Sequence, residues 1–285
     1  MSPMCLNRSR HHQPLRDLEE QLTAIKANEL GQAGLRHFKV IAKQVDLDEN
    51  GIPSPEFSFF LPCKVDLPPV DDDRIGMSFI DFDTPRRPGQ FALKDIGHAR
   101  GIGFYFLGYL GLCETDVQGQ DRGNWAVRQI IDYPFEMPLL GMKPEWQVID
   151  ISDVDDQEYP HLRCVMIYDS KGEDGKLLRG EILALTRLTT ERLETEQSKQ
   201  HIKAPILMFS FMGPQHGRML QAFFDGKRLV VNYTKIYDFR TKNIAGLSLF
   251  ARWGIGKPTG DTKDPSLLAD AGVNGGGGGG AANDN

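Results

Sequence analysis

Residues 203–256 read KAPILMFSFMGPQHGRMLQAFFDGKRLVVNYTKIYDFRTKNIAGLSLFARWGIG, and this stretch decides the fold. Its first apolar run, residues 206–212, is interrupted only by Ser210, as expected for a strand buried on both faces. Gly213-Pro214 ends the run, because proline has no N–H to donate to a central ladder. The stretch therefore begins with a core strand of a sheet.

A β-hairpin and a helix follow this strand. Residues 218–224 and 228–234 flank Asp225-Gly226-Lys227. An Asp-Gly pair suits a type I′ turn, in which both central residues need positive φ. After the hairpin, apolar side chains recur near helical spacing, which predicts a helix lying on the sheet. These apolar positions are Ile244, Leu247, Leu249, Phe250 and Trp253.

The apolar runs predict a common core. We expect Phe211, Phe223, Val231 and Trp253 to lie in one buried cluster, because each belongs to one of the runs.

The rest of the chain extends this pattern. Helices are predicted for residues 15–45, with a break at Gly31 and Gly34, for 96–114 and for 190–200, and strands for 146–151, 162–168 and 181–188. Residues 172–175, Gly-Glu-Asp-Gly, predict a hairpin loop between the last two strands. The sequence thus predicts an α+β fold, whose mainly antiparallel sheet is covered by the helices near 96–114 and 243–253.

Three regions are expected along the chain. Residues 1–95 form a helical and proline-rich, irregular N-terminal region, residues 96–260 the globular core, and residues 261–285 a disordered tail. The tail contains six consecutive glycines, Gly275 to Gly280. Such a segment buries too little apolar surface to offset the entropy of ordering it, so we expect it to be flexible.

Composition excludes several partner classes. The 285 residues carry a net charge of −6, with 40% hydrophobic and 25% charged residues, so no nucleic-acid partner is expected. The longest uncharged apolar run, residues 101–113, is too short to span a bilayer.

The four cysteines lie far apart without CxxC spacing and are typical of reduced thiols. We expect a cytoplasmic or nuclear protein.

An acidic loop suggests a calcium site. Asp46, Asp48 and Asn50 occupy positions 1, 3 and 5 of a calcium loop, and a predicted helix precedes them. Position 12 is Phe57 instead of the bidentate glutamate. The alternative is a turn stabilised by local hydrogen bonds of these Asx side chains. These three residues are the metal-binding candidates of the sequence.

Two other motifs are incomplete. The order of predicted elements is compatible with a degenerate metal-dependent nuclease, in which Asp150 ends a strand and Glu181 opens one. The residue two positions after Glu181 is Leu183, so the lysine of a Glu-x-Lys motif is missing. Gly101-Ile102-Gly103 lacks the third glycine of a dinucleotide-binding loop, because Phe106 stands there. No cofactor is predicted.

The loop between the first two core strands is the strongest candidate for chemistry. Glycines flank His216 and precede Arg218 in the sequence Gly-Pro-Gln-His-Gly-Arg. A histidine can exchange a proton near neutral pH, and an arginine can bind a carboxylate or phosphate. The alternative is that the loop is only a turn. A small anionic ligand or a protein is the expected partner.

The segments FSFMGPQHGR, AFFDGK and KIYDF, within residues 209–253, resemble a family of uncharacterised proteins from filamentous fungi. The resemblance covers under a fifth of the chain and implies no chemistry. Relatives of this kind are sometimes encoded among genes of specialised metabolism.

Two functional hypotheses follow. The first is an interaction or accessory protein without catalytic machinery. The second is an enzyme or a small-molecule-handling protein of fungal specialised metabolism, or a degenerate nuclease-like hydrolase.

Overall fold

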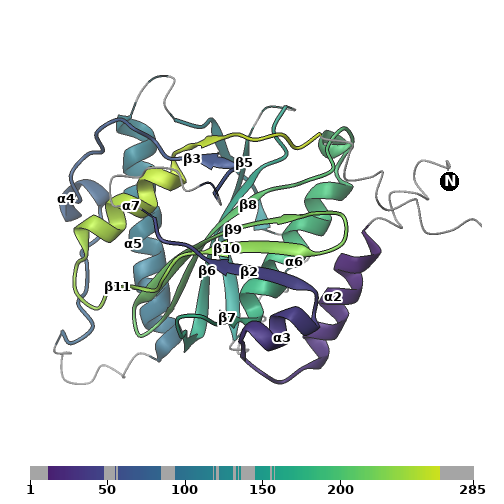
Figure 1. Cartoon of the computed structure of the whole chain (residues 1–285). Coiled ribbons are helices and arrows are strands. Elements are labelled where there is room, and N and C mark those ends of the chain that lie inside the picture. The colour runs from purple at the N-terminus through teal and green to yellow at the C-terminus, as the bar shows by residue number, and fades with distance from the viewer. Residues whose placement is uncertain are drawn as a thin grey trace, which may run out of the picture.

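The fold was obtained as a computed structural model (Figure 1). It describes residues 12–47, 55, 57–84, 94–117, 119, 122–130, 133, 135, 145–154, 156 and 158–263. The elements, in chain order, are α2 (Gln13–Ala24), β1 (Glu29–Leu30), α3 (Gln32–His37), β2 (Val40–Gln44), β3 (Phe60–Leu61), α4 (Asp72–Ile75), α5 (Asp95–Asp116), β4 (Trp125–Val127), β5 (Trp146–Val154), β6 (Leu162–Lys171), β7 (Leu177–Leu178), α6 (Arg179–Glu194), η2 (Glu196–Ser198), β8 (Ile206–Gly213), β9 (His216–Phe224), β10 (Leu229–Tyr233), β11 (Tyr237–Asp238), α7 (Ile244–Gly254) and β12 (Lys257–Pro258).

A large sheet with helices on both sides confirms the α+β prediction. Its strand order is β2-β10-β9-β8-β6-β5-β4, and β11 pairs with β9 to make eight strands. Most neighbours are antiparallel, as expected, but β6–β8 and β2–β10 are parallel pairs, so the sheet is mixed. The strands predicted at 146–151, 162–168 and 206–212, and the hairpin after them, are all present.

The strand predicted at residues 181–188 is wrong, because these residues belong to α6. Ile182, Leu185 and Leu188 are buried at helical spacing on one side of α6. A short apolar run is compatible with either period, so the pattern alone does not separate strand from helix. The tertiary structure does, because β6 and β8 are parallel and α6 is the crossover between them.

The helix predicted over residues 35–45 is also wrong. The chain leaves α3 at Phe38, passes through Lys39 with a left-handed φ of 57°, and continues as β2. β2 then pairs in parallel with β10, with Val40 opposite Leu229. The β-branched pair Val40-Ile41 favours a strand, and the edge of β10 supplies its partner.

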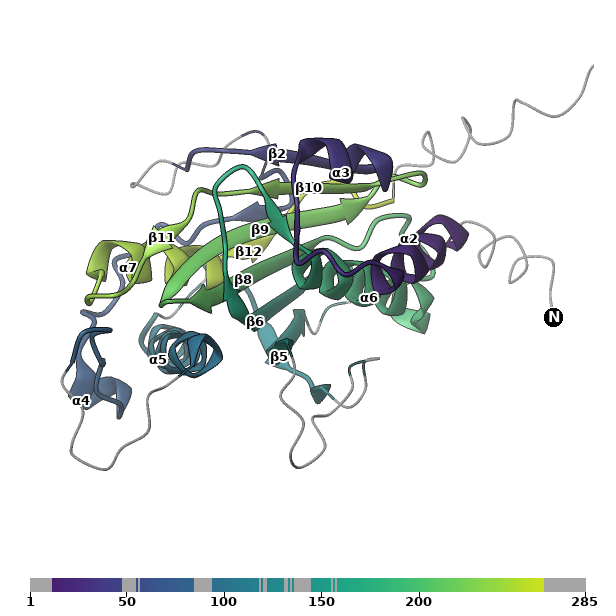
Figure 2. The ribbon, with the colours of Figure 1, turned by 90° about the horizontal axis from the view of Figure 1, so that it is seen from below.

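One face of the sheet is covered by α5 and α7, as predicted (Figure 2). Its buried cluster includes Phe106, Phe211, Phe250 and Trp253. A Cβ added at Gly103 of α5 would lie 3.1 Å from side-chain atoms of Ile149 and of Ile167, so glycine lets this helix approach the sheet closely. Close packing of α5 on the sheet therefore explains why residue 103, in the sequence Gly101-Ile102-Gly103, is a glycine.

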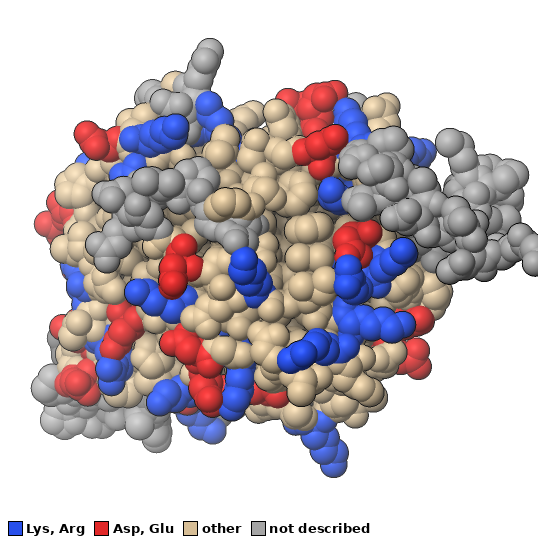
Figure 3. All heavy atoms as spheres, viewed as in Figure 1, with Lys and Arg blue, Asp and Glu red and all other residues tan. Residues whose placement is uncertain are grey.

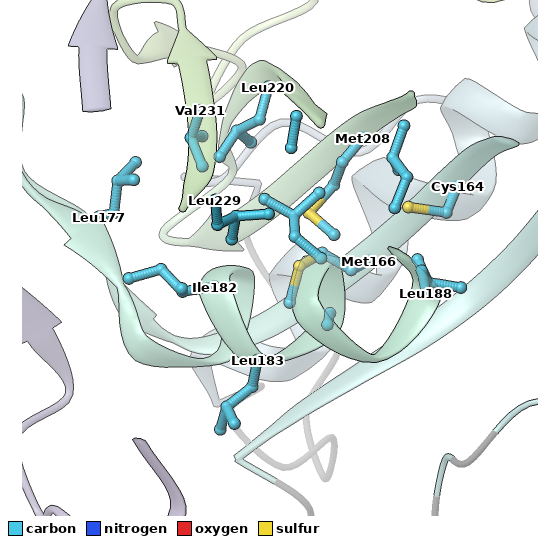
Figure 4. Close-up of a cluster of buried hydrophobic side chains, with 14 of the residues drawn as sticks. Cys164, Met166, Leu177, Ile182, Leu183, Leu188, Met208, Leu220, Leu229 and Val231 are labelled. Atoms are coloured by element: carbon cyan, nitrogen blue, oxygen red, sulfur yellow. The ribbon is translucent and has the colours of Figure 1, made fainter. Parts of the chain in front are cut away.

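The opposite face is covered by α6, against which α2 packs (Figures 2 and 4). Its buried cluster includes Met166, Met208, Leu220 and Val231. The predicted single core was therefore wrong in two respects. Val231 lies in this second cluster, whereas Phe211 and Trp253 share the first, and Phe223, which packs against the first cluster, is only half-buried. Side chains alternate between the two faces of a strand, and the runs themselves do not say which face each position occupies.

Segments from both ends of the chain join these layers. β3 pairs with β12, and Phe60 is completely buried. Near the C-terminal end of the described residues, the carbonyl of Thr262 accepts hydrogen bonds from the N–H groups of Ile202 at 2.9 Å and Lys203 at 3.3 Å. The chain is therefore still packed at Thr262. Most of the predicted tail, residues 264–285, lies outside the described residues.

Three of the cysteines, Cys63, Cys113 and Cys164, are buried free thiols, and Cys5 lies outside the described residues. Burial raises the pKa of Cys113 to about 12, so this thiol stays protonated. Of the helices within the described ranges, none has the length and apolar content needed to cross a membrane.

His161, which precedes β6, predicts a pH-dependent stability. Its side chain is fully buried, with Nε2 2.9 Å from the carbonyl oxygen of Thr259, and burial lowers its pKa to about 3. The unfolded chain has the ordinary histidine pKa of about 6.5, so stability is full above that pH and decreases as the pH falls. Between pH 7 and pH 5, wild type should lose about 2 kcal/mol more than the His161→Leu variant in urea unfolding. Parallel losses in the two proteins would contradict a neutral, buried His161.

Candidate functional site

His216 begins β9 and lies beside β11. Its Nε2 is 3.8 Å from the Oδ1 of Asp238, the residue opposite it in the β9–β11 pair. Burial lowers the pKa of His216, with the Asp238 carboxylate acting in the opposite direction. Its buried Nδ1 has no hydrogen-bond partner within the described residues. A neutral imidazole packed at a strand end follows from this placement.

Arg218 lies two residues further along β9 and is completely buried. Its Nε and Nη2 donate to the two carboxylate oxygens of Glu181 at 2.9 and 2.5 Å, and its Nη1 donates to the carbonyl of Lys176 at 2.7 Å. The guanidinium also lies 5.6 Å from the ring centroid of Tyr233. The guanidinium of Arg218 is thus hydrogen-bonded or packed on every side within the protein, so it is not available to bind an external anion.

The calcium candidates are only partly described. Asp46 is exposed, whereas Asp48 and Asn50 lie outside the described residues. The element before Asp46 is the strand β2, so the helix expected to lead into a calcium loop is missing. Throughout the described ranges, no three His, Cys, Asp or Glu side chains are grouped to hold a metal ion.

The fold has the order of elements expected for a degenerate nuclease but not its pair of acidic residues. Apart from the two-residue strand β7, which lies outside the large sheet, the elements α5, β4, β5, β6, α6 and β8 follow an αβββαβ order. However, Glu181 lies in α6, where it is paired with Arg218, and Asp150 lies inside β5 instead of at its end. The two acids therefore do not form the expected pair.

A buried arginine lies among the acids of α5 and β5. The Nη1 of Arg163 donates to Oε1 of Glu114 at 2.8 Å, and its Nη2 donates to Oγ of Ser152 at 3.0 Å. The hydroxyl of Ser152 donates in turn to Oδ2 of Asp150 at 3.2 Å, and burial raises the pKa of Asp150. A side-chain cation already occupies this cluster, which favours a structural role.

A groove of about 500 Å³ lies between α2, the α3–β2 connection and the β9–β10 turn. We call it the basic groove. Its floor includes Leu15 and Leu18 of α2 and Leu229 of β10, which are buried. Phe38, half-buried, forms part of an apolar wall.

The rim of the basic groove carries exposed cations. Lys39, Lys227 and Arg228 line it, with His37 beside them and Asp17 as an opposing charge. Figure 3 shows Lys and Arg side chains gathered on this side of the molecule. Within the described residues, no ion pair involves the two lysines.

The turn sequence positions this rim. The carboxylate of Asp225 accepts hydrogen bonds from the N–H groups of Lys227 at 2.9 Å and Arg228 at 2.7 Å, and it also pairs with the Arg228 guanidinium at 3.2 Å. Within residues 225–228, only Gly226 has a positive φ, 90°, so the predicted type I′ turn, which needs two such residues, is wrong. The turn is instead stabilised by a carboxylate, because an Asp side chain can accept hydrogen bonds from the backbone N–H groups two and three residues ahead.

A second, smaller cavity of about 110 Å³ lies between residues 77–80 and α5. His98 and Gln215 line it, and His98 Nδ1 is 3.1 Å from Gln215 Oε1. The amide of Gln215 donates to the carbonyls of Ile80 and Phe239 at 3.0 and 3.1 Å. Gln215 therefore ties the loop of the sequence-based candidate site to its neighbours.

The basic groove is not predicted by the sequence. Its walls come from residues 14–39 and 224–229, which are far apart in the chain. The one local signal is the sequence Asp-Gly-Lys-Arg at residues 225–228, which places two cations at an exposed turn. Comparison with protein-family models, with curated proteins and with solved structures found no match for this chain.

Proposed function

We propose that the protein is a non-catalytic interaction module whose basic groove binds acidic, leucine-bearing peptide segments. The observation that supports this proposal best is the combination of an apolar floor with a rim of exposed lysines in one groove of about 500 Å³. Volumes of this size are typical of ligand-binding clefts.

The groove offers two complementary kinds of contact. Lys39, on the α3–β2 connection, and Lys227, on the β9–β10 turn, lie at neighbouring strand ends, because β2 pairs with β10 and Val40 is opposite Leu229. Each supplies an ammonium group for a carboxylate, while Phe38 and Leu18 offer apolar surface to a leucine side chain between the acids. Exposed ion pairs contribute at most about 1 kcal/mol each, so we expect modest, salt-sensitive binding.

The internal bonding of the other candidates supports a non-catalytic role. Arg218 and Arg163 are each held by carboxylates from the same chain. His216 is half-buried with a lowered pKa. The groove places exposed polar groups above an apolar floor, which is the arrangement that a binding surface needs.

Fluorescence anisotropy with a fluorescein-labelled Asp-Leu-Leu-Asp peptide tests the proposal. The full chain should bind this peptide in low salt, and Lys39→Glu or Lys227→Glu should weaken binding at least tenfold, because each reverses a charge on the rim. A Lys-Leu-Leu-Lys peptide should not bind. Binding should weaken in 0.5 M salt, since screening shortens the range of the attraction.

Two further variants serve as controls. Lys64→Glu makes the same charge change at an exposed lysine outside the groove and should leave binding unchanged. Lys39→Gly removes the charge while relieving a left-handed backbone, so it should weaken binding with thermal stability at least equal to wild type. Equal affinity for the acidic and basic peptides, or full binding by Lys227→Glu, would contradict the proposal. Binding of octanoate alone, with the same lysine dependence, would point to a small-molecule site instead.

A further inference from the structure

The described chain ends close to the basic groove. Thr262 is buried and bonded to the backbone of Lys203, three residues before β8 begins. The first residue of β8, Ile206, lies opposite Ala222, two residues before Phe224, which lines the groove. Lys203 therefore lies at the end of the sheet where the β9–β10 turn is found. Figure 1 shows the yellow end of the described chain reaching this same side.

The residues that follow have the chemistry expected of a groove ligand. Residues 264–270 read DPSLLAD, in which Asp264 and Asp270 flank Leu267-Leu268. No lysine or arginine occurs from residue 264 to residue 285. The segment that precedes α2 has the opposite character, because it carries Arg8 and Arg10 and no acid. Charge complementarity thus selects the C-terminal segment over the N-terminal one.

The geometry permits this contact within one molecule. Thr262 is bonded to Lys203, and the strands β8, β9 and β10 follow one another in the sheet, each about 4.8 Å from the next. The groove is therefore on the order of 10–15 Å from the end of the described chain. Four residues of extended chain cover about 13 Å, which brings Leu267 within reach.

We propose that residues 264–270 bind the basic groove of their own chain and thereby compete with external acidic peptides. This inference rests on the proposed function of the groove. Asp264 and Asp270 pair with the rim lysines, and Leu267 or Leu268 contacts the apolar wall at Phe38. A tethered segment has an effective concentration of about 1 mM, so even weak intrinsic binding keeps the groove largely occupied.

The test compares the full chain with a full-length variant that carries Leu267→Ser, Leu268→Ser, Asp264→Lys and Asp270→Lys. The labelled Asp-Leu-Leu-Asp peptide should bind this variant about tenfold more tightly than wild type, because the internal competitor has been removed. Asp284→Lys, a charge reversal outside the segment, should behave as wild type. Acetylation of Lys39 and Lys227 by dilute acetic anhydride, read by mass spectrometry, should be several-fold faster in the four-residue variant.

The outcomes separate the two proposals. Equal peptide affinity and equal lysine reactivity in wild type and variant would overturn the inference while leaving the groove a peptide site. Absence of peptide binding by both proteins would overturn the proposed function as well. Protection of the lysines only at high protein concentration would show that a second copy supplies the segment, which would overturn binding within one chain.

Discussion

Replacing Arg218 with alanine is expected to lower the free energy of unfolding by about 3–5 kcal/mol. The substitution leaves the Glu181 carboxylate buried without its cation, since Glu181 and Arg218 are both completely inaccessible to solvent. The carbonyl of Lys176 loses its donor as well. Urea unfolding monitored by circular dichroism measures the effect.

A double variant distinguishes an unpaired charge from lost packing. Arg218→Met with Glu181→Leu removes both charges and keeps similar side-chain volume, so it should unfold at a higher urea concentration than Arg218→Ala. If Arg218→Ala instead left the midpoint unchanged, the internal ion pair would not stabilise the fold, and the arginine would again be a candidate for ligand binding.

Replacing Phe211 with alanine is expected to cost a similar amount, about 3–5 kcal/mol. Phe211 is fully buried, and its ring lies 5.4 Å from that of Phe106 and 6.0 Å from those of Phe239 and Phe250. The variant would lose these contacts and leave a cavity between β8, α5 and α7, because the surrounding helices cannot collapse fully. The urea midpoint should fall accordingly, with an unchanged slope.

Phe104→Ala is the matched control for this prediction. Phe104 lies on the solvent side of α5 with 42% of its surface exposed, so its loss should change stability by less than about 0.5 kcal/mol. Equal effects at Phe104 and Phe211 would mean that the burial described for this face of the sheet is incorrect.

Local patterns predicted the elements whose partners are close in sequence. The strands β8, β9 and β10 and the helix α7 follow one another along residues 206–254, and each shows its own period and end signal. α5 was predicted for the same reason, because its 22 residues are long enough to separate a helix from a strand. In these segments, local preference and tertiary environment agree.

The mispredicted elements depend on partners far away in the chain. Residues 40–44 became a strand because β10 offers them an edge, and residues 181–188 became a helix because a parallel pair needs a crossover. Neither partner is visible within a window of 10 to 20 residues.

The candidate functional residues also show the difference between what local sequence predicts and what distant parts of the chain decide. The sequence by itself determined that His216 and Arg218 follow a core strand and that residues 225–228 form a turn with two cations. Only the tertiary structure decided that Arg218 faces Glu181 of α6 inside the core, and that Lys227 and Lys39 line the same groove. The physical reason is that burial and pairing of a charged side chain are set by the elements packed against its strand, and these elements come from distant parts of the chain.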